Sequence, residues 1–191
     1  MVYVFLADGF EEIEALCPID LMRRAGIEVT AVSVAGKRQV TGSHNISVEA
    51  DVLIEQLKID ELPELIMLPG GMPGAVNLSE DKRLSQLIKS SASAGVMIAA
   101  ICAAPFILGE LGLLENRAAT CYPGYEKALT GARISEKEVV HDGNIITAAG
   151  MGVSFEFGLE IVRSLRGFEA AERIADSIRF RANNKDGMTH V

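Results

Sequence analysis

The sequence has no block of basic residues, and its lysines and arginines never gather beyond pairs such as Arg23-Arg24. Eighteen basic residues face 26 acidic ones, which gives a formal net charge of −8. A surface of this sign repels a phosphate backbone, so we expect no nucleic-acid partner. Charged residues still make up 23% of the chain and apolar residues 49%, a composition that excludes general disorder and predicts a globular fold.

Long hydrophobic runs are also missing. No apolar stretch approaches the length of a membrane span, and residues 1–7 form an apolar segment too short for a signal peptide, with no basic residues before it. We therefore expect no membrane partner and a cytoplasmic location. The length of 191 residues fits one domain, 1–191, with a sizeable core and a polar tail from about residue 182.

Cysteine is scarce: Cys17, Cys102 and Cys121 are widely spaced, and no C-x-x-C pair occurs. An odd number at such spacings predicts neither a disulfide scaffold nor a zinc site, so we expect no metal and no other cofactor. Cys17 falls within a helical pattern, which places it in the core.

Short apolar strands alternate with helical patterns. Strands are predicted at 3–7, 27–34, 65–68, 96–101 and 118–121, with a small β-excursion at 36–51 and a hairpin at 139–147. Helices are predicted at 11–25, 81–91, 104–111, 155–165 and 170–180. This alternation predicts an α/β sandwich around a parallel, doubly wound sheet. Pro18 lies inside the first helical pattern, so that helix is expected to begin or kink there.

The most informative stretch is the apolar run 95–101, which ends abruptly at Cys102 and is followed by Ala103, Ala104 and Pro105. Such a run predicts a buried strand that feeds directly into a helix, and the tight turn between them requires small residues. Cys102 would then face a helix N-terminus, which favours the thiolate. A thiol with a pKa of about 8.5 is roughly 3% ionised at pH 7, so a lower pKa needs a second donor, such as a protonated carboxylic acid.

Ligands of such a sheet bind at the carboxyl ends of its strands. Four loops should meet there: 8–14, 69–74, 102–105 and 121–124. Glu14 is bracketed by apolar residues and is predicted to face inward, whereas Glu11 and Glu12 are expected to be solvated complements of the helix dipole. Gly70 and Gly71 either form a plain loop or bring backbone N–H groups close to a substrate oxyanion.

A cysteine nucleophile ordinarily uses a histidine base, and none can be paired with Cys102 from the sequence. His141 and His190 are predicted at the surface, and His44, in the β-excursion, has no assigned role. Cys121 and Tyr122 end a predicted strand at the same rim as Cys102. A packing role and a polar role at the site remain equally open for Tyr122.

Four ordered motifs carry a family resemblance: residues 7–14 (ADGFEEIE), 68–71 (LPGG), 100–105 (AICAAP) and 154–157 (SFEF). With these, almost the whole chain to about residue 165 resembles the ThiJ/PfpI superfamily, in the branch of the parkinsonism-associated deglycase. The resemblance implies a flavodoxin-like three-layer sandwich and a homodimer. It also implies Cys102 as an oxidisable nucleophile, Glu14 as its protonated partner, and the backbone N–H groups of Gly71 and Ala103 as oxyanion donors.

The chain departs from the family pattern at three places. Protease-like and amidotransferase relatives carry histidine directly after the cysteine, and Ala103 excludes that triad. The closer branch often has a histidine before the proline of the loop 121–124, where this chain has Tyr122. The cysteine that relatives carry in the β-excursion is also missing from residues 46–49.

Two functions of different classes follow. The first is enzymatic: Cys102 attacks a small reactive α-oxoaldehyde, or the same aldehyde on a glycated protein, without glutathione, and Glu14 moves the proton. The second is a redox sensor or stress chaperone in which Cys102 is held as the sulfinate. A flavodoxin-like nucleotide binder is disfavoured, because the acidic loop 8–12 would repel phosphate.

Overall fold

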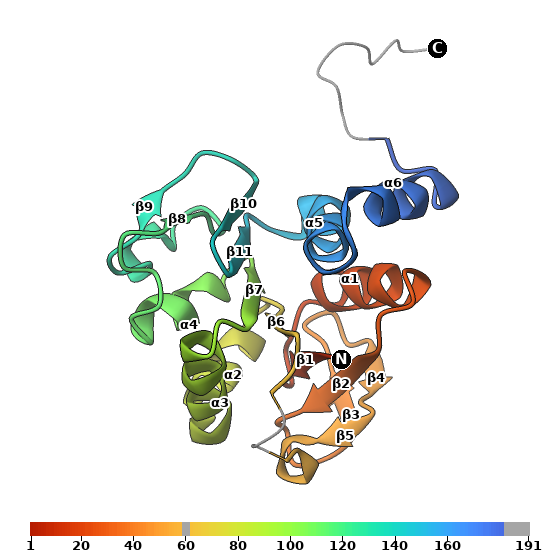
Figure 1. Cartoon of the computed structure of the whole chain (residues 1–191). Helices are drawn as coiled ribbons and strands as arrows, with labels where there is room; N and C mark the ends of the chain where they lie inside the picture. The colour runs from red at the N-terminus through yellow and green to blue at the C-terminus, as the bar shows by residue number, and fades with distance from the viewer. Residues whose placement is uncertain (59–61, 182–191) are drawn as a thin grey trace.

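A seven-stranded sheet forms the centre of the molecule, with the order β10-β11-β7-β6-β1-β2-β5 (Figure 1). The computed structural model describes residues 1–58 and 62–181. The strands of the sheet are β1 (Val2–Leu6), β2 (Val29–Ser33), β5 (Val52–Leu53), β6 (Leu65–Leu68), β7 (Met97–Ile101), β10 (Val139–Asp142) and β11 (Ile145–Ala148). All neighbours pair in parallel except the hairpin of β10 and β11, as the strand and hairpin patterns predict.

The central strands are buried along their whole length. Every residue of β1 and β6 is buried, and Val4 of β1 lies between Ala31 and Met67 of the neighbouring strands. Strands that are covered on both faces read as continuous apolar runs, which is why the sequence reveals them so clearly.

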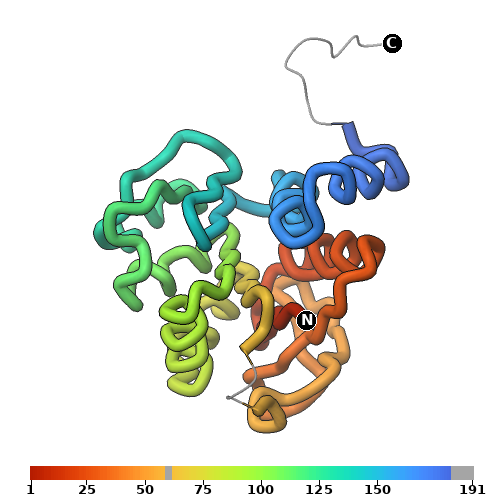
Figure 2. The backbone as a smooth tube through the Cα atoms, viewed as in Figure 1, coloured from red at the N-terminus to blue at the C-terminus, as the bar shows by residue number. Residues whose placement is uncertain are grey.

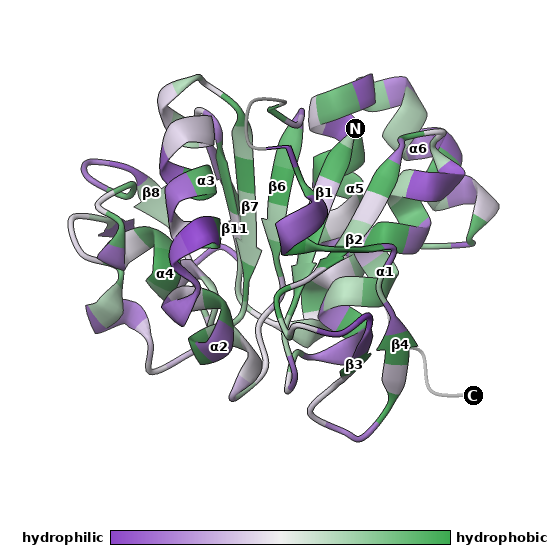
Figure 3. Cartoon of the chain, turned by 90° about the horizontal axis from the view of Figure 1, so that it is seen from below, coloured by the Kyte–Doolittle hydropathy of each residue, from purple (hydrophilic) through white to green (hydrophobic). Residues whose placement is uncertain are grey.

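Helices cover both faces of this sheet, and together with the sheet they confirm the predicted α/β sandwich. The face shown on the right of Figure 1 carries α1 (Glu12–Arg24), α5 (Ser154–Arg166) and α6 (Phe168–Ser177). The opposite face carries α2 (Gly74–Glu80), α3 (Lys82–Ser93) and α4 (Pro105–Glu110). Each face has its own apolar cluster, and Figure 3 shows the hydrophobic colour concentrated on the strands.

Helix α1 begins at Glu12 and continues across Pro18, so the expectation that it starts or kinks at the proline is wrong for its start. Glu11 caps the helix, because its side chain accepts a hydrogen bond from the backbone N–H of Glu14. Gly158 of α5 packs closely against this proline: a side chain on Gly158 would lie 3.1 Å from Cα of Pro18. The two helices therefore touch backbone to backbone.

The predicted strand 118–121 is also corrected. Only β8 (Ala118–Ala119) forms there, and it pairs with β9 (Arg133–Ile134) outside the main sheet. The edge of β7 where it would have added is occupied by β11, which pairs with β7 in parallel. The β-excursion is a small hairpin of β3 (Gln39–Thr41) and β4 (Ser47–Glu49), as expected.

In the part of the chain that the structure describes, single turns of 3₁₀ helix lie at Ile54–Gln56, Glu126–Ala128 and Met151–Val153. Figure 2 shows the chain starting at β1, in the middle of the molecule, and reaching α6 at the periphery, where α6 packs on α5. Among the residues that the structure describes, no helix is both long and apolar enough to cross a membrane.

Candidate active site

Cys102 occupies the turn between β7 and α4 in a backbone conformation that side-chain-bearing residues rarely adopt, with φ of 63°. Its N–H donates to the carbonyl of Ala148 at 2.8 Å, and its own carbonyl accepts from Tyr122 N–H at 2.8 Å. Both neighbouring segments thus hold the strained residue in place. The small residues Ala103 and Ala104, from which the sequence predicts a tight turn, are both buried directly behind it.

Glu14 projects from the first turn of α1 toward this turn and is only 1% exposed. Its carboxyl interacts with the Cys102 thiol, so that each group shifts the pKa of the other, and its Oε2 accepts from the N–H of Gly70 at 2.9 Å. A side chain on Gly70 would lie 2.7 Å from that oxygen and 2.8 Å from Cβ of Cys102. Only glycine leaves room at this position for the acid and the thiol to meet.

Two backbone N–H groups point at the Cys102 sulfur, those of Gly71 and Ala103. Gly71 has φ of 85°, and a side chain there would overlap the backbone of residues 9–11. Hydrogen bonds from these groups favour the thiolate and lower the pKa of Cys102, so they could equally hold an oxyanion formed beside the sulfur.

The ionisation of the pair differs from the expected lowering of the thiol pKa. Burial raises the pKa of Glu14 to about 7, against the opposing hydrogen bonds from Cys102, Gly70 and Met151. Burial and the nearby Glu14 carboxylate together raise the pKa of Cys102 to about 12. Between about pH 7 and 12 the two groups therefore share one proton, and the sulfur carries charge when that proton lies on Glu14.

The loop 121–124 reaches the site through its backbone, since Tyr122 N–H donates to the carbonyl of Cys102. Cys121 is buried in the apolar cluster of the α2–α4 face, and burial raises its pKa to about 11. The ring of Tyr122 is about half exposed, and Cδ2 would lie 3.3 Å from a side chain on Gly150. Neither side chain has a hydrogen bond to Cys102 in the described residues.

The expectation that Glu11 and Glu12 are solvated is wrong, since both are buried. Glu12 Oε1 accepts from the backbone N–H of His44 at 2.7 Å, and Oε2 lies 2.9 Å from His44 Nδ1. Possible ligand atoms of these three residues lie within 4.8 Å of one another, although the Glu12 oxygens already have donors from the chain. The contact joins residues 32 apart, so the local pattern of charges could not reveal it.

The sequence also predicts surface positions for His141 and His190 and a core position for Cys17. His141, on β10, lies 2.8 Å from Oε1 of Glu160 and is exposed, as predicted, whereas His190 is outside the described residues. Cys17 is half-buried against the core rather than fully enclosed, and burial raises its pKa to about 12.

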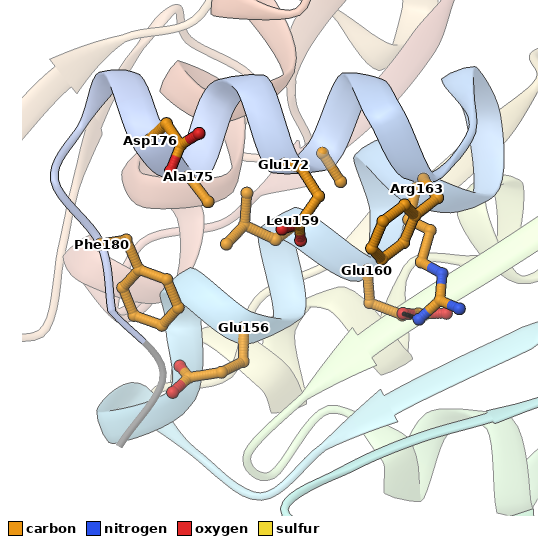
Figure 4. Close-up of a pocket in the computed structure, with 10 residues that line it drawn as sticks. Glu156, Leu159, Glu160, Arg163, Glu172, Ala175, Asp176 and Phe180 are labelled. Atoms are coloured by element: carbon orange, nitrogen blue, oxygen red, sulfur yellow. Dashed lines mark ion pairs between the residues drawn. The ribbon is translucent and has the colours of Figure 1, made fainter. Parts of the chain in front are cut away.

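A groove between α5 and α6 encloses about 320 Å³, but none of its residues belongs to the four loops around Cys102 (Figure 4). Its floor is apolar, with Leu159 and Phe180, and Glu156, Glu160, Glu172 and Asp176 carry its carboxylates. The groove contains no thiol and is separate from the chemistry described above.

The geometry at Cys102 defines a class of site: a thiol at a strained strand-to-helix turn, a buried acid that shares its proton, and two N–H groups facing the sulfur. The model of the DJ-1/PfpI family matches residues 1–164, and the chain belongs to this family. The chain aligns with 98% of its length to protein DJ-1 homolog B from Arabidopsis thaliana, at 39% identity, but spans only 43% of that relative.

Shorter relatives are matched nearly end to end. The Parkinson disease protein 7 homolog from Danio rerio is 40% identical over 90% of this chain and 92% of its own. A protein named deglycase from Pyrococcus abyssi is 31% identical over 86% of this chain and 99% of its own. The solved structure of oxidized DJ-1 from Toxoplasma gondii has a TM-score of 0.91 at 35% identity, covering 95% and 98% of the two chains. These likenesses confirm the family resemblance and the flavodoxin-like fold.

Proposed function

We propose that the chain processes reactive α-oxoaldehydes with Cys102 as nucleophile and Glu14 as proton partner, without glutathione, as a glyoxalase III or protein deglycase in stress protection. The observation that carries the proposal is that the Cys102 thiol and the Glu14 carboxyl meet beside Gly70 and shift each other's pKa, with the pKa of the buried carboxyl raised to about 7. The similarity to a relative that is named deglycase supports the same function.

The first step is the addition of the Cys102 sulfur to the aldehyde carbon of methylglyoxal. The thiol proton passes through Glu14 to the former aldehyde oxygen, which gives a hemithioacetal. While that oxygen carries negative charge, the N–H groups of Gly71 and Ala103 stabilise it.

Glu14, now a carboxylate, moves the hydrogen from the carbon bonded to sulfur to the neighbouring carbon, and the proton of the hemithioacetal hydroxyl passes to the oxygen on that neighbouring carbon. The hemithioacetal thereby becomes a thioester of lactate with no net change in oxidation state. Water then cleaves the thioester: its OH group joins the acyl carbon and its other proton goes to the sulfur. The product leaves as lactate after giving its acid proton to the Glu14 carboxylate, which releases that proton to solvent. The raised pKa of Glu14 suits a group that must act as acid and base near neutral pH.

The test is the formation of D- and L-lactate from methylglyoxal by purified protein, with Cys102→Ala as the inactive variant and Cys17→Ala as the matched control. Loss of lactate formation in the first variant alone supports the proposal. Equal rates of lactate formation by wild type and Cys102→Ala would contradict the proposal. Release of the aldehyde from a glycated peptide, followed in parallel, distinguishes a deglycase from a glyoxalase.

A second candidate is a redox sensor or stress chaperone, favoured by the absence of any histidine partner for Cys102 among the described residues. A sulfinate at Cys102 would accept from Gly71, Ala103 and protonated Glu14, which requires no turnover. The related Toxoplasma gondii structure is described as oxidized. Peptide mass spectrometry after mild peroxide treatment tests this function, which fails if Cys17 or Cys121 is oxidised before Cys102.

We also propose a homodimer formed through the outer face of α1. Ile13 and Leu16 of that helix are 46% and 37% exposed, and Ile46 of the nearby turn is 55% exposed. Exposed apolar side chains gathered on one face are typical of a protein interface. The same face begins at the helix end that carries Glu14, so a partner on it would lie next to the site.

A further inference from the structure

The turn 42–46, between β3 and β4, closes around the carboxylate of Glu12. That side chain is 3% exposed, and the donors to its oxygens come from this turn. They are His44 N at 2.7 Å, His44 Nδ1 at 2.9 Å, Ile46 N at 3.4 Å and Ser43 Oγ at 3.4 Å. A side chain on Gly42 would overlap the carboxylate, so the turn is shaped to this one acid.

The same hairpin holds the loop that leads into α1. Gly9 N–H donates to the carbonyl of Thr41 at 2.7 Å, and Thr41 N–H donates to Oδ1 of Asp8 at 2.9 Å. The N–H of Ser43 donates to the carbonyl of Phe10 at 2.8 Å. Residues 8–10 are therefore fixed from the hairpin side.

On its other side this loop carries the candidate active site. Glu11 N–H donates to the carbonyl of Gly70 at 2.9 Å, and Oε2 of Glu11 accepts from Glu14 N–H at 2.7 Å. The charge of Glu11 is also one of the causes that raise the pKa of Glu14. Any displacement of the loop, or any change in charge at Glu11, thus reaches Glu14 directly.

His44 supplies the positive charge of this arrangement. Its Nδ1 lies 2.9 Å from Oε2 of Glu12 and 4.0 Å from Oε1 of Glu11, and its ring is 70% exposed. These two carboxylates of α1 and the hydroxyl of Ser43, 3.1 Å away, are the charged or polar side chains that face the ring in the described structure. The imidazolium adds a positive charge beside two acids whose other partners are backbone N–H groups and the Ser43 hydroxyl.

We infer that His44 is a positioning residue for the Cys102–Glu14 pair: with Glu12 as its anchor, it fastens the turn 42–46 to the start of α1 and offsets the charge of Glu11 beside Glu14. The inference rests on the proposed function only in taking Cys102 as the reactive thiol. No contact between His44 and a substrate is needed.

The ionisation of the pair agrees with this role. The hydrogen bond to Glu12 raises the pKa of His44. Burial acts to raise the pKa of Glu12, but hydrogen bonds from His44 and from backbone N–H groups outweigh burial and lower the pKa of Glu12 to about 2. Stability from a raised histidine pKa is present below its unfolded value of 6.5 and is lost as pH rises through the folded value. The acid end of the window is the titration of Glu12 near pH 2.

The test compares the full chain with His44→Ala, His44→Arg and the control His141→Ala, which alters an exposed histidine on β10. The rate of alkylation of Cys102 by iodoacetamide is followed from pH 5 to 9 by peptide mass spectrometry, which separates this thiol from Cys17 and Cys121. Hydrogen exchange of the amides 41–46 is measured in parallel.

For His44→Ala we expect the step in the alkylation profile that belongs to Glu14 to move up by roughly half a pH unit, which is about threefold in rate below the step. The amides 41–46 should exchange faster, and His44→Arg should restore both properties because its charge persists at every pH of the assay. His141→Ala should match wild type. An unmoved step in His44→Ala, or an arginine variant that behaves like alanine, would overturn the inference.

Alkylation needs no aldehyde turnover, so the outcomes remain separable from those of the proposed function. A protein that forms no lactate but shows the shifted step retains the positioning role. A protein that forms lactate with an unmoved step loses the role of His44 and keeps the enzymatic function.

Discussion

At the scale of single residues, the chemistry depends on one proton that Glu14 and Cys102 share. A raised acid pKa of about 7 beside a raised thiol pKa of about 12 means that the first proton leaves near neutrality and the second only in strong base. Between these values a small, constant fraction of molecules has the proton on Glu14 and the charge on sulfur. Reactivity of the thiol should therefore follow the titration of the acid.

The first prediction concerns this titration. In wild type the rate of Cys102 alkylation should rise with pH through about 7 and then form a plateau, because the singly protonated pair is fully populated above that pH. Glu14→Gln keeps the shape of the side chain but cannot titrate, so its profile should lack the step near pH 7. A step that persists in the variant would assign the titration to another group.

The second prediction follows from the same pKa through protein stability. Between pH 4.5 and about 7 the folded state keeps a proton on Glu14 that the unfolded chain has released, so stability falls as pH rises. The shift corresponds to about 3 kcal/mol. In urea unfolding at pH 5 and pH 8, Glu14→Gln should lose most of this pH dependence, whereas Glu169→Gln on exposed α6 should retain it.

Much of the site's composition can be predicted from local sequence, because strand ends and small residues fix where Cys102 and Gly70 lie. Glu14 could be predicted to face inward from its apolar neighbours. The burial of Glu12 could not, since its donors come from residues more than 30 positions away. The upward shift of the Cys102 pKa could not be predicted from the sequence either, because it depends on how completely the folded chain removes water from the site.

At the scale of elements, the contact of α1 with α5 fixes the helix that carries Glu14. Gly158 brings the two backbones together, and a methyl group there would lie 2.6 Å from Cδ1 of Leu21 and 3.1 Å from Cα of Pro18. The proline inside α1 thus lies next to Gly158, where both its backbone and the end of the Leu21 side chain come close to α5.

The third prediction tests that contact. Glycine to alanine inside a helix usually adds about 1 kcal/mol of stability, but Gly158→Ala should instead destabilise the protein by about 1–3 kcal/mol, because α1 must move away. Urea unfolding measures the change, with Gly152→Ala as the control, since nothing lies within 4 Å of a side chain there. A stabilised Gly158→Ala would contradict the close packing.

Continuous apolar runs, such as those of β1, β6 and β7, predict their strands within a residue or two because both faces of each strand are buried. The prediction of a strand at 118–121 is wrong because a local apolar pattern indicates strand propensity but does not tell which strand pairs with the edge of β7. That edge of β7 is filled by β11, which follows 26 residues after β8 in the chain. Pairing between distant segments decided the outcome.

At the scale of the whole molecule, the proposed dimer gives the fourth prediction. Leu16→Glu places a charge on the outer face of α1 and should convert a dimer to a monomer, because an unpaired carboxylate would be buried at the interface. Analytical ultracentrifugation measures the mass. Ile134→Glu, at an apolar position on β9 that is even more exposed, should leave the mass unchanged. A monomeric mass for the wild-type protein would contradict the proposed homodimer.

The two strands that deliver Gly70 and Cys102 are neighbours in the middle of the sheet, with two or more strands on either side. Central strands are usually the last to open, whereas peripheral helices and hairpins open more easily. Local opening of α6 or of the β3–β4 hairpin would leave the spacing between these two strand ends intact. Modification of Cys102 under native conditions should therefore report on the folded site and proceed without any global unfolding event.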